Sequence, residues 1–196
     1  MLNRSHLGVK SLVFFLVATV TACEGDYTPK PRGYFRIQFP EKGYKQYKSA
    51  CNFSFNYPTY ALIEPDTSAQ AKPCWMDVAF PAFNARLHLS YYPVRSNEVF
   101  NELTEDARTF AFKHTVKATA IDEALISYPD KKVHGVFYTI EGNTASAMQF
   151  FLTDSSENYL RGALYFNEKP RLDSIQPVLK FLKDDLHVMI ESTEWK

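Results

Sequence analysis

The stretch 133–141 (VHGVFYTIE) is followed closely by 145–153 (ASAMQFFLT) and by 159–167 (YLRGALYFN). A run of the same kind, 121–128 (IDEALISY), precedes them. These runs are rich in aromatic and β-branched residues and are separated by short turn-forming segments, a pattern typical of strands. Because the connections are short, neighbouring strands are predicted to pair as antiparallel hairpins. This four-strand meander decides the fold.

Three shorter segments upstream of the meander are also predicted to be strands: 52–57 (NFSFNY), 75–80 (WMDVAF) and 85–92 (ARLHLSYY). The first alternates apolar and polar residues and stops at a proline, as strands do. Residues 60–63 are a possible return strand after 52–57. Residues 34–39 (YFRIQF) alternate loosely and are either an edge strand or an arm lying on the domain.

Two segments have the period of an amphipathic helix instead, because their apolar residues recur at steps of three and four. They are residues 98–115 and 175–192. Asp184 and Asp185 are assigned to the polar side of the second helix. The residues expected at the starts of the helices are Ser96 or Asn97 as the first cap, Ser174 as the second cap, and Pro177 in the first turn of the second helix.

Strands and helices in this order predict an α+β fold, mainly antiparallel sheet with two packed helices. The order resembles the PsbP/Mog1-like sandwich, in which helices pack on either side of such a sheet. That likeness concerns the fold and carries no function by itself. The 16 Phe and 12 Tyr residues agree with a sheet-rich protein. The equal numbers of basic and acidic residues, 22 of each, argue against a nucleic-acid partner, which needs a basic face.

The N-terminus has the features of a secretory signal peptide. The apolar run 11–20 (SLVFFLVATV) follows Arg4 and Lys10, with no acidic residue before it, and is too short to cross a bilayer as a helix. It ends in Val-Thr-Ala-Cys, which fits the bacterial lipobox, so Cys23 is expected to be lipidated and to become the first residue. The alternative is an ordinary signal peptide with Cys23 incidental.

On the lipoprotein interpretation the chain has three parts. Residues 1–22 are the signal peptide, 23–33 are a lipidated tether with two prolines, and 34–196 are a single globular domain. Cys51 and Cys74 then remain as an even pair in an exported chain, which favours a disulfide; the alternative is two free buried thiols.

No catalytic motif, metal-ligand spacing or cofactor-binding motif stands out, so no catalytic residue, metal or cofactor is predicted. A basic and aromatic arm next to the membrane is a candidate for binding a partner, because Arg and Tyr are frequent interface anchors. The alternative is a solvated linker followed by an edge strand. The residues of this arm are Lys30, Arg32, Tyr34, Phe35 and Arg36. The many aromatic residues on strands either form the core or stack on sugars, which leaves a peptidoglycan-binding module as an alternative function.

The chain also resembles the gliding motility lipoprotein family of the GldD type, known from Bacteroidetes. The resemblance spans essentially the whole mature chain. The segments that carry it are 28–40 (TPKPRGYFRIQFP), Cys74-Trp75, 113–118 (KHTVKA), 142–155 (GNTASAMQFFLTDS), 160–167 (LRGALYFN) and 173–178 (DSIQPV). The resemblance implies a cell-envelope lipoprotein needed for gliding, a process tied in this group to type IX secretion. It implies no enzyme activity, and the one residue carried over is the lipidated Cys23.

The expected function is therefore a non-enzymatic scaffold or assembly factor, lipid-anchored and facing the periplasm, with the choice between inner and outer membrane left open. Its expected partners are the membrane, through the lipid, and other gliding or secretion proteins of the envelope. No small-molecule substrate is expected. A hydrolase is the weakest alternative, because no pair of residues suggests one.

Overall fold

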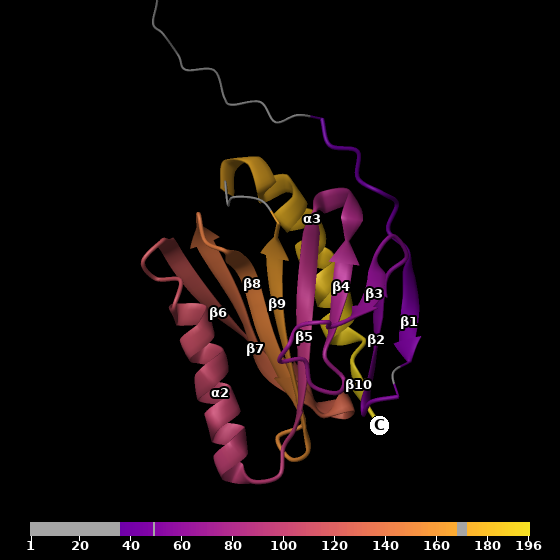
Figure 1. The fold of residues 1–196 in the computed structure, drawn as a ribbon, viewed down its shortest axis with the longest axis vertical. Helices are drawn as coiled ribbons and strands as arrows, with labels where there is room; N and C mark the ends of the chain where they lie inside the picture. Colours follow the sequence, from indigo (N-terminus) through magenta and orange to yellow (C-terminus); the bar gives the residue numbers. More distant parts are fainter. Residues whose placement is uncertain (1–35, 49, 168–171) are drawn as a thin grey trace, which may run out of the picture. The chain divides into compact units, whose positions relative to one another are not determined.

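The computed structural model describes residues 36–48, 50–167 and 172–196, with the side chains of all but 172–174. The predicted signal peptide and tether, residues 1–33, lie outside this part of the chain. From Gln38 to Lys196 the chain forms one compact unit (Figure 1).

A seven-stranded sheet in which every neighbouring pair is antiparallel forms the main layer of this unit. The predicted meander is confirmed, because its strands occupy four adjacent places at one side of the sheet. The strands, in order across the sheet, are β3 (Leu62–Pro65), β4 (Met76–Phe80), β5 (Ala85–Pro93), β9 (Asn158–Phe166), β8 (Ser146–Thr153), β7 (Val133–Gly142) and β6 (Ala118–Tyr128). Two 3₁₀ turns, η1 (Pro81–Phe83) and η2 (Pro129–Lys131), connect β4 to β5 and β6 to β7.

A second, three-stranded sheet has the order β1 (Tyr44–Lys48), β2 (Phe53–Pro58) and β10 (Glu194–Trp195). The return strand expected beside 52–57 is wrong. Both edges of β2 are occupied by β1 and β10, and the chain after β2 crosses to the large sheet as β3, where Leu62 pairs with Ala79 of β4. Residues 36–39 are not a strand either, since the first strand of the described chain starts at Tyr44.

The described residues contain two α-helices, α2 (Asn97–Phe112) and α3 (Leu172–Glu191), which lie on opposite faces of the seven-stranded sheet. Adjacent residues of a strand point to opposite faces. On β8, Phe151 belongs to the core cluster under α2. The next side chain, Phe150, stacks on Phe137, which in turn stacks on His187 of α3. The predicted α+β class, with mainly antiparallel sheet and two packed helices, is confirmed.

The starts of the two helices differ in how well the sequence predicted them. Ser96 caps α2, because its hydroxyl accepts the backbone N–H of Val99 at 3.3 Å. For α3 the expectation is wrong: the helix already includes Leu172, so Ser174 is not its cap and Pro177 lies inside it rather than in the first turn.

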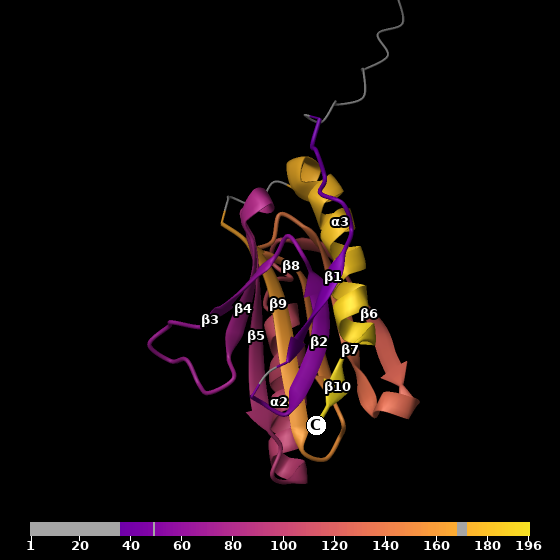
Figure 2. The ribbon, with the colours of Figure 1, turned by 90° about the vertical axis from the view of Figure 1, so that its right-hand side faces the viewer.

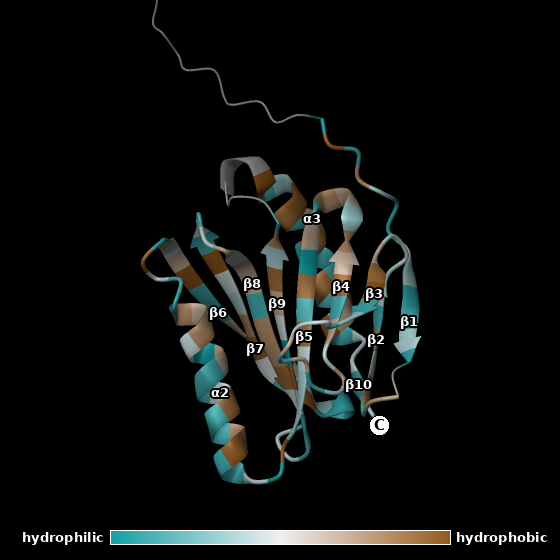
Figure 3. Cartoon of the chain, in the orientation of Figure 1, coloured by the Kyte–Doolittle hydropathy of each residue, from teal (hydrophilic) through white to brown (hydrophobic). Residues whose placement is uncertain are grey.

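The core holds most of the large aromatic side chains of the strands. Burial of each such side chain contributes roughly 1.5–3 kcal/mol. In Figure 3, hydrophobic and hydrophilic residues alternate around α2, as expected for a helix with one face on a sheet. The aromatic residues with almost no exposed surface are Phe53, Phe55, Phe80, Phe150 and Tyr159.

Candidate functional site

Most residues that the sequence singles out for function lie outside the described part of the chain. Cys23 and four residues of the predicted partner-binding arm are among them, so lipidation and the arm stay predictions. Those four arm residues are Lys30, Arg32, Tyr34 and Phe35. The fifth, Arg36, is exposed and belongs to no strand.

The chain that follows this arm lies on α3. Phe39 stacks on Phe181 with ring centroids 4.5 Å apart, and Tyr60 stacks on the same ring at 5.8 Å. Figure 2 shows this first segment running alongside α3 before it enters β1. Beside these rings lies a buried polar group centred on Asp185. We call the whole set the attachment cluster; its residues are Phe39, Lys42, Tyr44, Tyr60, Phe181 and Asp185.

Asp185 is the centre of the attachment cluster, although only 1% of its surface is exposed. Its Oδ1 accepts hydrogen bonds from the Lys42 ammonium at 2.6 Å and from the Tyr44 hydroxyl at 2.8 Å, and its Oδ2 accepts one from the Tyr60 hydroxyl. The Lys42 ammonium also donates to the Phe181 carbonyl and lies 3.5 Å from the centre of that ring. A buried carboxylate is tolerated only when it is paired and hydrogen-bonded in this way.

The two tyrosines of the cluster are held as neutral hydrogen-bond donors. Burial raises the pKa of both Tyr44 and Tyr60, and the hydrogen bond to Asp185 and its negative charge raise it further.

The assignment of Asp185 to the polar side of the helix is wrong, because Asp185 is buried, whereas its neighbour Asp184 is exposed. The sequence contained one signal for this. Asp185 falls on the same helical face as Leu182 and Met189, which are both buried.

Cys51 and Cys74 form a disulfide, with their Cα atoms 6.0 Å apart. Cys51 lies just before β2 of the small sheet and Cys74 just before β4 of the large sheet. Cys74 has a φ of 71°, a conformation uncommon for residues other than glycine. The bond therefore joins the two sheets and fixes the loop before β4 in an unusual backbone geometry.

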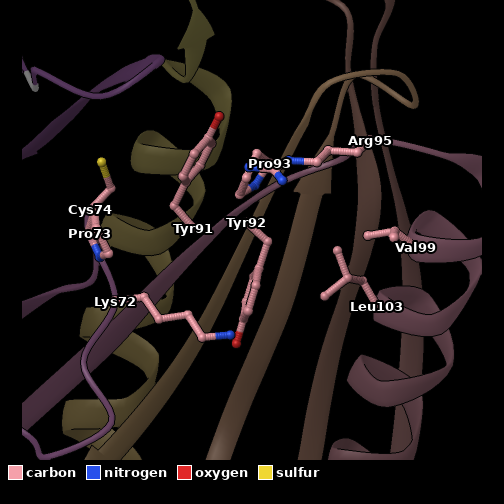
Figure 4. A pocket seen from close by; sticks show the side chains of 9 residues that line it. All are labelled: Lys72, Pro73, Cys74, Tyr91, Tyr92, Pro93, Arg95, Val99 and Leu103. Atoms are coloured by element: carbon pink, nitrogen blue, oxygen red, sulfur yellow. The ribbon is translucent and has the colours of Figure 1, made fainter.

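A pocket of about 510 Å³ lies between this loop, the end of β5 and the first half of α2. In Figure 4, Val99 and Leu103 project from α2 toward the pocket, and Lys72 extends from the opposite side toward the Tyr92 ring. The full lining is Lys72, Pro73, Cys74, Tyr91, Tyr92, Pro93, Arg95, Val99 and Leu103.

The polar group closest to a catalytic arrangement lies on the open face of β3–β5. His88 Nδ1 is 2.5 Å from Asp77 Oδ1, and Arg86 binds both Asp77 and Glu64. An aspartate beside a histidine orients the imidazole in many enzymes, but acyl transfer also needs a nucleophile on the other ring nitrogen. His88 contacts Asp77 and the ring of Tyr165. This set is a cross-strand ion-pair network.

Neither metal sites nor spanning helices are found in the described ranges. Among these residues, no group of three or more His, Cys, Asp or Glu side chains has the geometry to hold a metal ion. None of the helices described there is long and apolar enough to cross a membrane.

Comparison with known proteins finds solved structures of similar fold and a matching family. No curated protein matches the sequence. The solution structure of cyanobacterial PsbP from Synechocystis sp. PCC 6803 is similar at 10% identity, over 80% of this chain and 95% of that chain, with a TM-score of 0.47. The family described as gliding motility lipoprotein GldD matches residues 24–195. The chain therefore belongs to the gliding motility lipoprotein GldD family, and this membership implies a lipid-anchored protein involved in gliding motility.

Proposed function

We propose that the protein is a non-enzymatic scaffold or assembly factor on the periplasmic side of the cell envelope. Lipid on Cys23 holds it at a membrane, and its α+β domain is presented to other proteins of the gliding and type IX secretion machinery. The observation that carries this proposal is the family match, which extends from residue 24 to residue 195 and so includes the whole compact unit.

The attachment cluster supports a scaffold that works within a limited distance of the membrane. A fully extended chain over residues 24–37 spans at most roughly 50 Å. From Phe39 onward the chain is bound to α3 through the Phe181 ring and through Asp185. On this proposal the domain stays within roughly 50 Å of the lipid, and its partners lie within the same distance.

The polar groups of the described chain support a role without catalysis. Asp185 is saturated by three donors from other segments. Asp77 is shared between Arg86 and His88. Catalytic acids and bases need a lone pair or proton that faces a substrate, and both carboxylates are instead used to hold strands and a helix together.

The test of the proposal is to separate the anchor from the domain. Cys23→Ala should release the protein from membranes and abolish gliding, whereas Glu24→Gln, which keeps the cysteine, should do neither. A transmembrane helix fused before Glu24 should restore gliding to the Cys23→Ala protein. Gliding by an unanchored Cys23→Ala protein, or failure of the fused anchor to rescue a well-expressed domain, would contradict tethering as the mechanism.

A peptidoglycan-binding module remains the second candidate because of one aromatic pair. Trp75 and Tyr92 are both partly exposed beside the pocket, with ring centroids 5.5 Å apart. Aromatic rings of this kind stack on sugars. If the protein binds peptidoglycan, purified peptidoglycan retains it and Tyr92→Ala weakens this retention. Tyr128→Ala, at the end of the edge strand β6, should not weaken it. If peptidoglycan does not retain the protein, this second function is excluded.

A further inference from the structure

We propose that the pocket between α2 and residues 72–74 binds a small anionic molecule with an apolar body, such as a medium-chain carboxylate. The proposal concerns binding without chemical conversion and goes beyond the scaffold function. It rests on the shape of the pocket, on the charges at its rim and on the rigidity of its walls.

The walls of the pocket suit an apolar body. Val99 and Leu103 of α2 form one side, Tyr92 and Pro93 of β5 form the floor, and Pro73 lies opposite. Val99, Leu103 and Tyr92 are only partly buried by the protein itself, so a ligand would cover apolar surface that is otherwise wet. The volume of about 510 Å³ lies within the usual range for small-molecule sites, roughly 300–1,000 Å³.

The charged residues that line the pocket are both basic. Lys72 and Arg95 are exposed, and in the described chain neither forms an ion pair. The Lys72 ammonium lies 5.2 Å from the centre of the Tyr92 ring, which places it over the apolar floor (Figure 4). Both cations line the pocket, so its rim attracts an anion.

Charged residues of both signs act on Tyr92, on the floor of the pocket. Burial is the main cause that raises the pKa of Tyr92, and two charged residues act on it in opposite directions. Arg161 lowers the pKa and Asp106 raises it, with the larger effect from Arg161. The preference for an anion therefore rests on Lys72 and Arg95 at the rim of the pocket.

The pocket is held open before any ligand arrives. The disulfide from Cys74 to Cys51 fixes the loop that carries Lys72. The Trp75 indole N–H donates to the Tyr91 carbonyl at 3.1 Å, which pins the same loop to β5. A preformed pocket avoids the entropy of ordering loops on binding, so a small ligand suffices to occupy it.

The experiment uses the chain from Glu24 to Lys196, because the unit Gln38–Lys196 contains its own core and its disulfide. Anilinonaphthalene sulfonate, an anionic fluorescent probe, is bound first and then displaced by decanoate or by neutral 1-decanol. We expect decanoate to displace the probe at about tenfold lower concentration than decanol. Equal potency of the two, or no saturable binding of the probe, overturns the proposal.

Matched double variants test the role of the charges. Lys72→Gln with Arg95→Gln should weaken decanoate binding about five- to tenfold, because exposed ion pairs are individually weak, and should leave decanol binding unchanged. Arg108→Gln with Lys113→Gln removes the same charge from another hollow beside α2 and should change neither. An equal loss in both double variants overturns the proposal, since it would show a general charge effect.

Two further measurements locate the ligand. Val99→Trp should fill the pocket and abolish displacement by both molecules, with its urea midpoint showing whether the variant is folded. A diazirine analogue of decanoate should label the peptide containing Val99 and Leu103 in the unsubstituted protein, and labelling elsewhere overturns the proposal.

An acetylated Leu-Asp dipeptide serves as a model of a partner protein. If it binds as tightly as decanoate, with the same dependence on Lys72 and Arg95, the pocket is a site for a partner protein and the proposal is overturned. None of these measurements depends on membrane attachment, so they test the ligand proposal separately from the proposed scaffold function.

Discussion

The Lys42 ammonium lies 2.6 Å from Asp185 Oδ1, and this contact joins residues 143 positions apart in the sequence. Lys42 lies just before β1, and Asp185 lies in α3. The pair is surrounded by Phe181 and by the hydroxyls of Tyr44 and Tyr60, so it is shielded from water and from salt more than a surface pair would be.

Removal of the Asp185 carboxylate should be among the most damaging single changes in the domain. Asp185→Ala removes the carboxylate that accepts from the Lys42 ammonium and from two tyrosine hydroxyls, and we expect a loss of about 3 kcal/mol in the free energy of unfolding. Urea titration measures it. Asp184→Ala, at the exposed neighbouring position, should change the free energy by less than about 0.5 kcal/mol. Similar values for the two variants would show that the cluster does not stabilise the fold.

The disulfide should contribute about 3 kcal/mol, because it closes a loop with a sequence separation of 23 residues. Cys51→Ser with Cys74→Ser should lower the urea midpoint by the corresponding amount. Addition of a reductant should lower the midpoint of the unsubstituted protein to that of the double variant and leave the double variant unchanged. A midpoint that is insensitive to reductant, in a protein that shows two free thiols after reduction, would contradict this.

Gly135 of β7 should not tolerate a side chain. A Cβ atom at this position would lie 1.8 Å from the Phe151 carbonyl oxygen, and a backbone atom cannot move aside without opening the β7–β8 pairing. We expect Gly135→Ala to cost about 3 kcal/mol. Gly43→Ala is the control, since its Cβ would meet only the Thr59 side chain at 3.4 Å. Thermal unfolding of the two variants distinguishes them, and equal melting temperatures would refute the expectation.

Asp154 should stabilise the β8–β9 turn in a pH-dependent way. Burial alone would raise its pKa, but the backbone N–H groups of Asn158, Glu157 and Ser156 lower the pKa to about 2. A carboxyl whose pKa is lowered on folding stabilises the protein above its ordinary pKa near 4, and this contribution disappears as the pH falls to about 2.

Asp154→Ala should therefore cost about 1–2 kcal/mol at pH 7, a value that allows for solvent screening of a partly exposed group. The difference from the unsubstituted protein should shrink between pH 4 and pH 2. Urea titrations at several pH values measure it, with Asp130→Ala, an exposed carboxylate in η2, as the control. If the difference in the free energy of unfolding between Asp154→Ala and the unsubstituted protein stays constant down to pH 2, the negative charge of Asp154 does not contribute to stability.

The fold was predictable where local sequence and tertiary structure agree. The meander strands alternate or are continuously apolar, and each is followed at once by its partner, so their pairing needed no distant information. Strand β1 has the sequence YKQYK and is mostly exposed, which gives no apolar pattern to detect. Strand β10 has only two residues, and its pairing with β2 depends on chain ends that are far apart in sequence.

The site was less predictable because it depends on contacts between distant segments. Asp185 is adjacent to an exposed aspartate, and only its position on the apolar face of α3 distinguishes it. The pocket is formed by a loop, a strand end and a helix, each of which looks ordinary alone. The even number of cysteines after Cys23 was the one simple pattern that pointed to a long-range contact.

The small sheet is made from both ends of the described chain, with β2 between β1 and β10. The Trp195 indole N–H also donates to the Lys132 carbonyl, and the Lys196 backbone N–H donates to Asn52. Strand β2 therefore acquires its second neighbour only after Glu194 and Trp195 have been synthesised, long after β2 itself. Until then the small sheet is incomplete, and removal of residues 194–196 would leave one edge of β2 open for pairing with another chain.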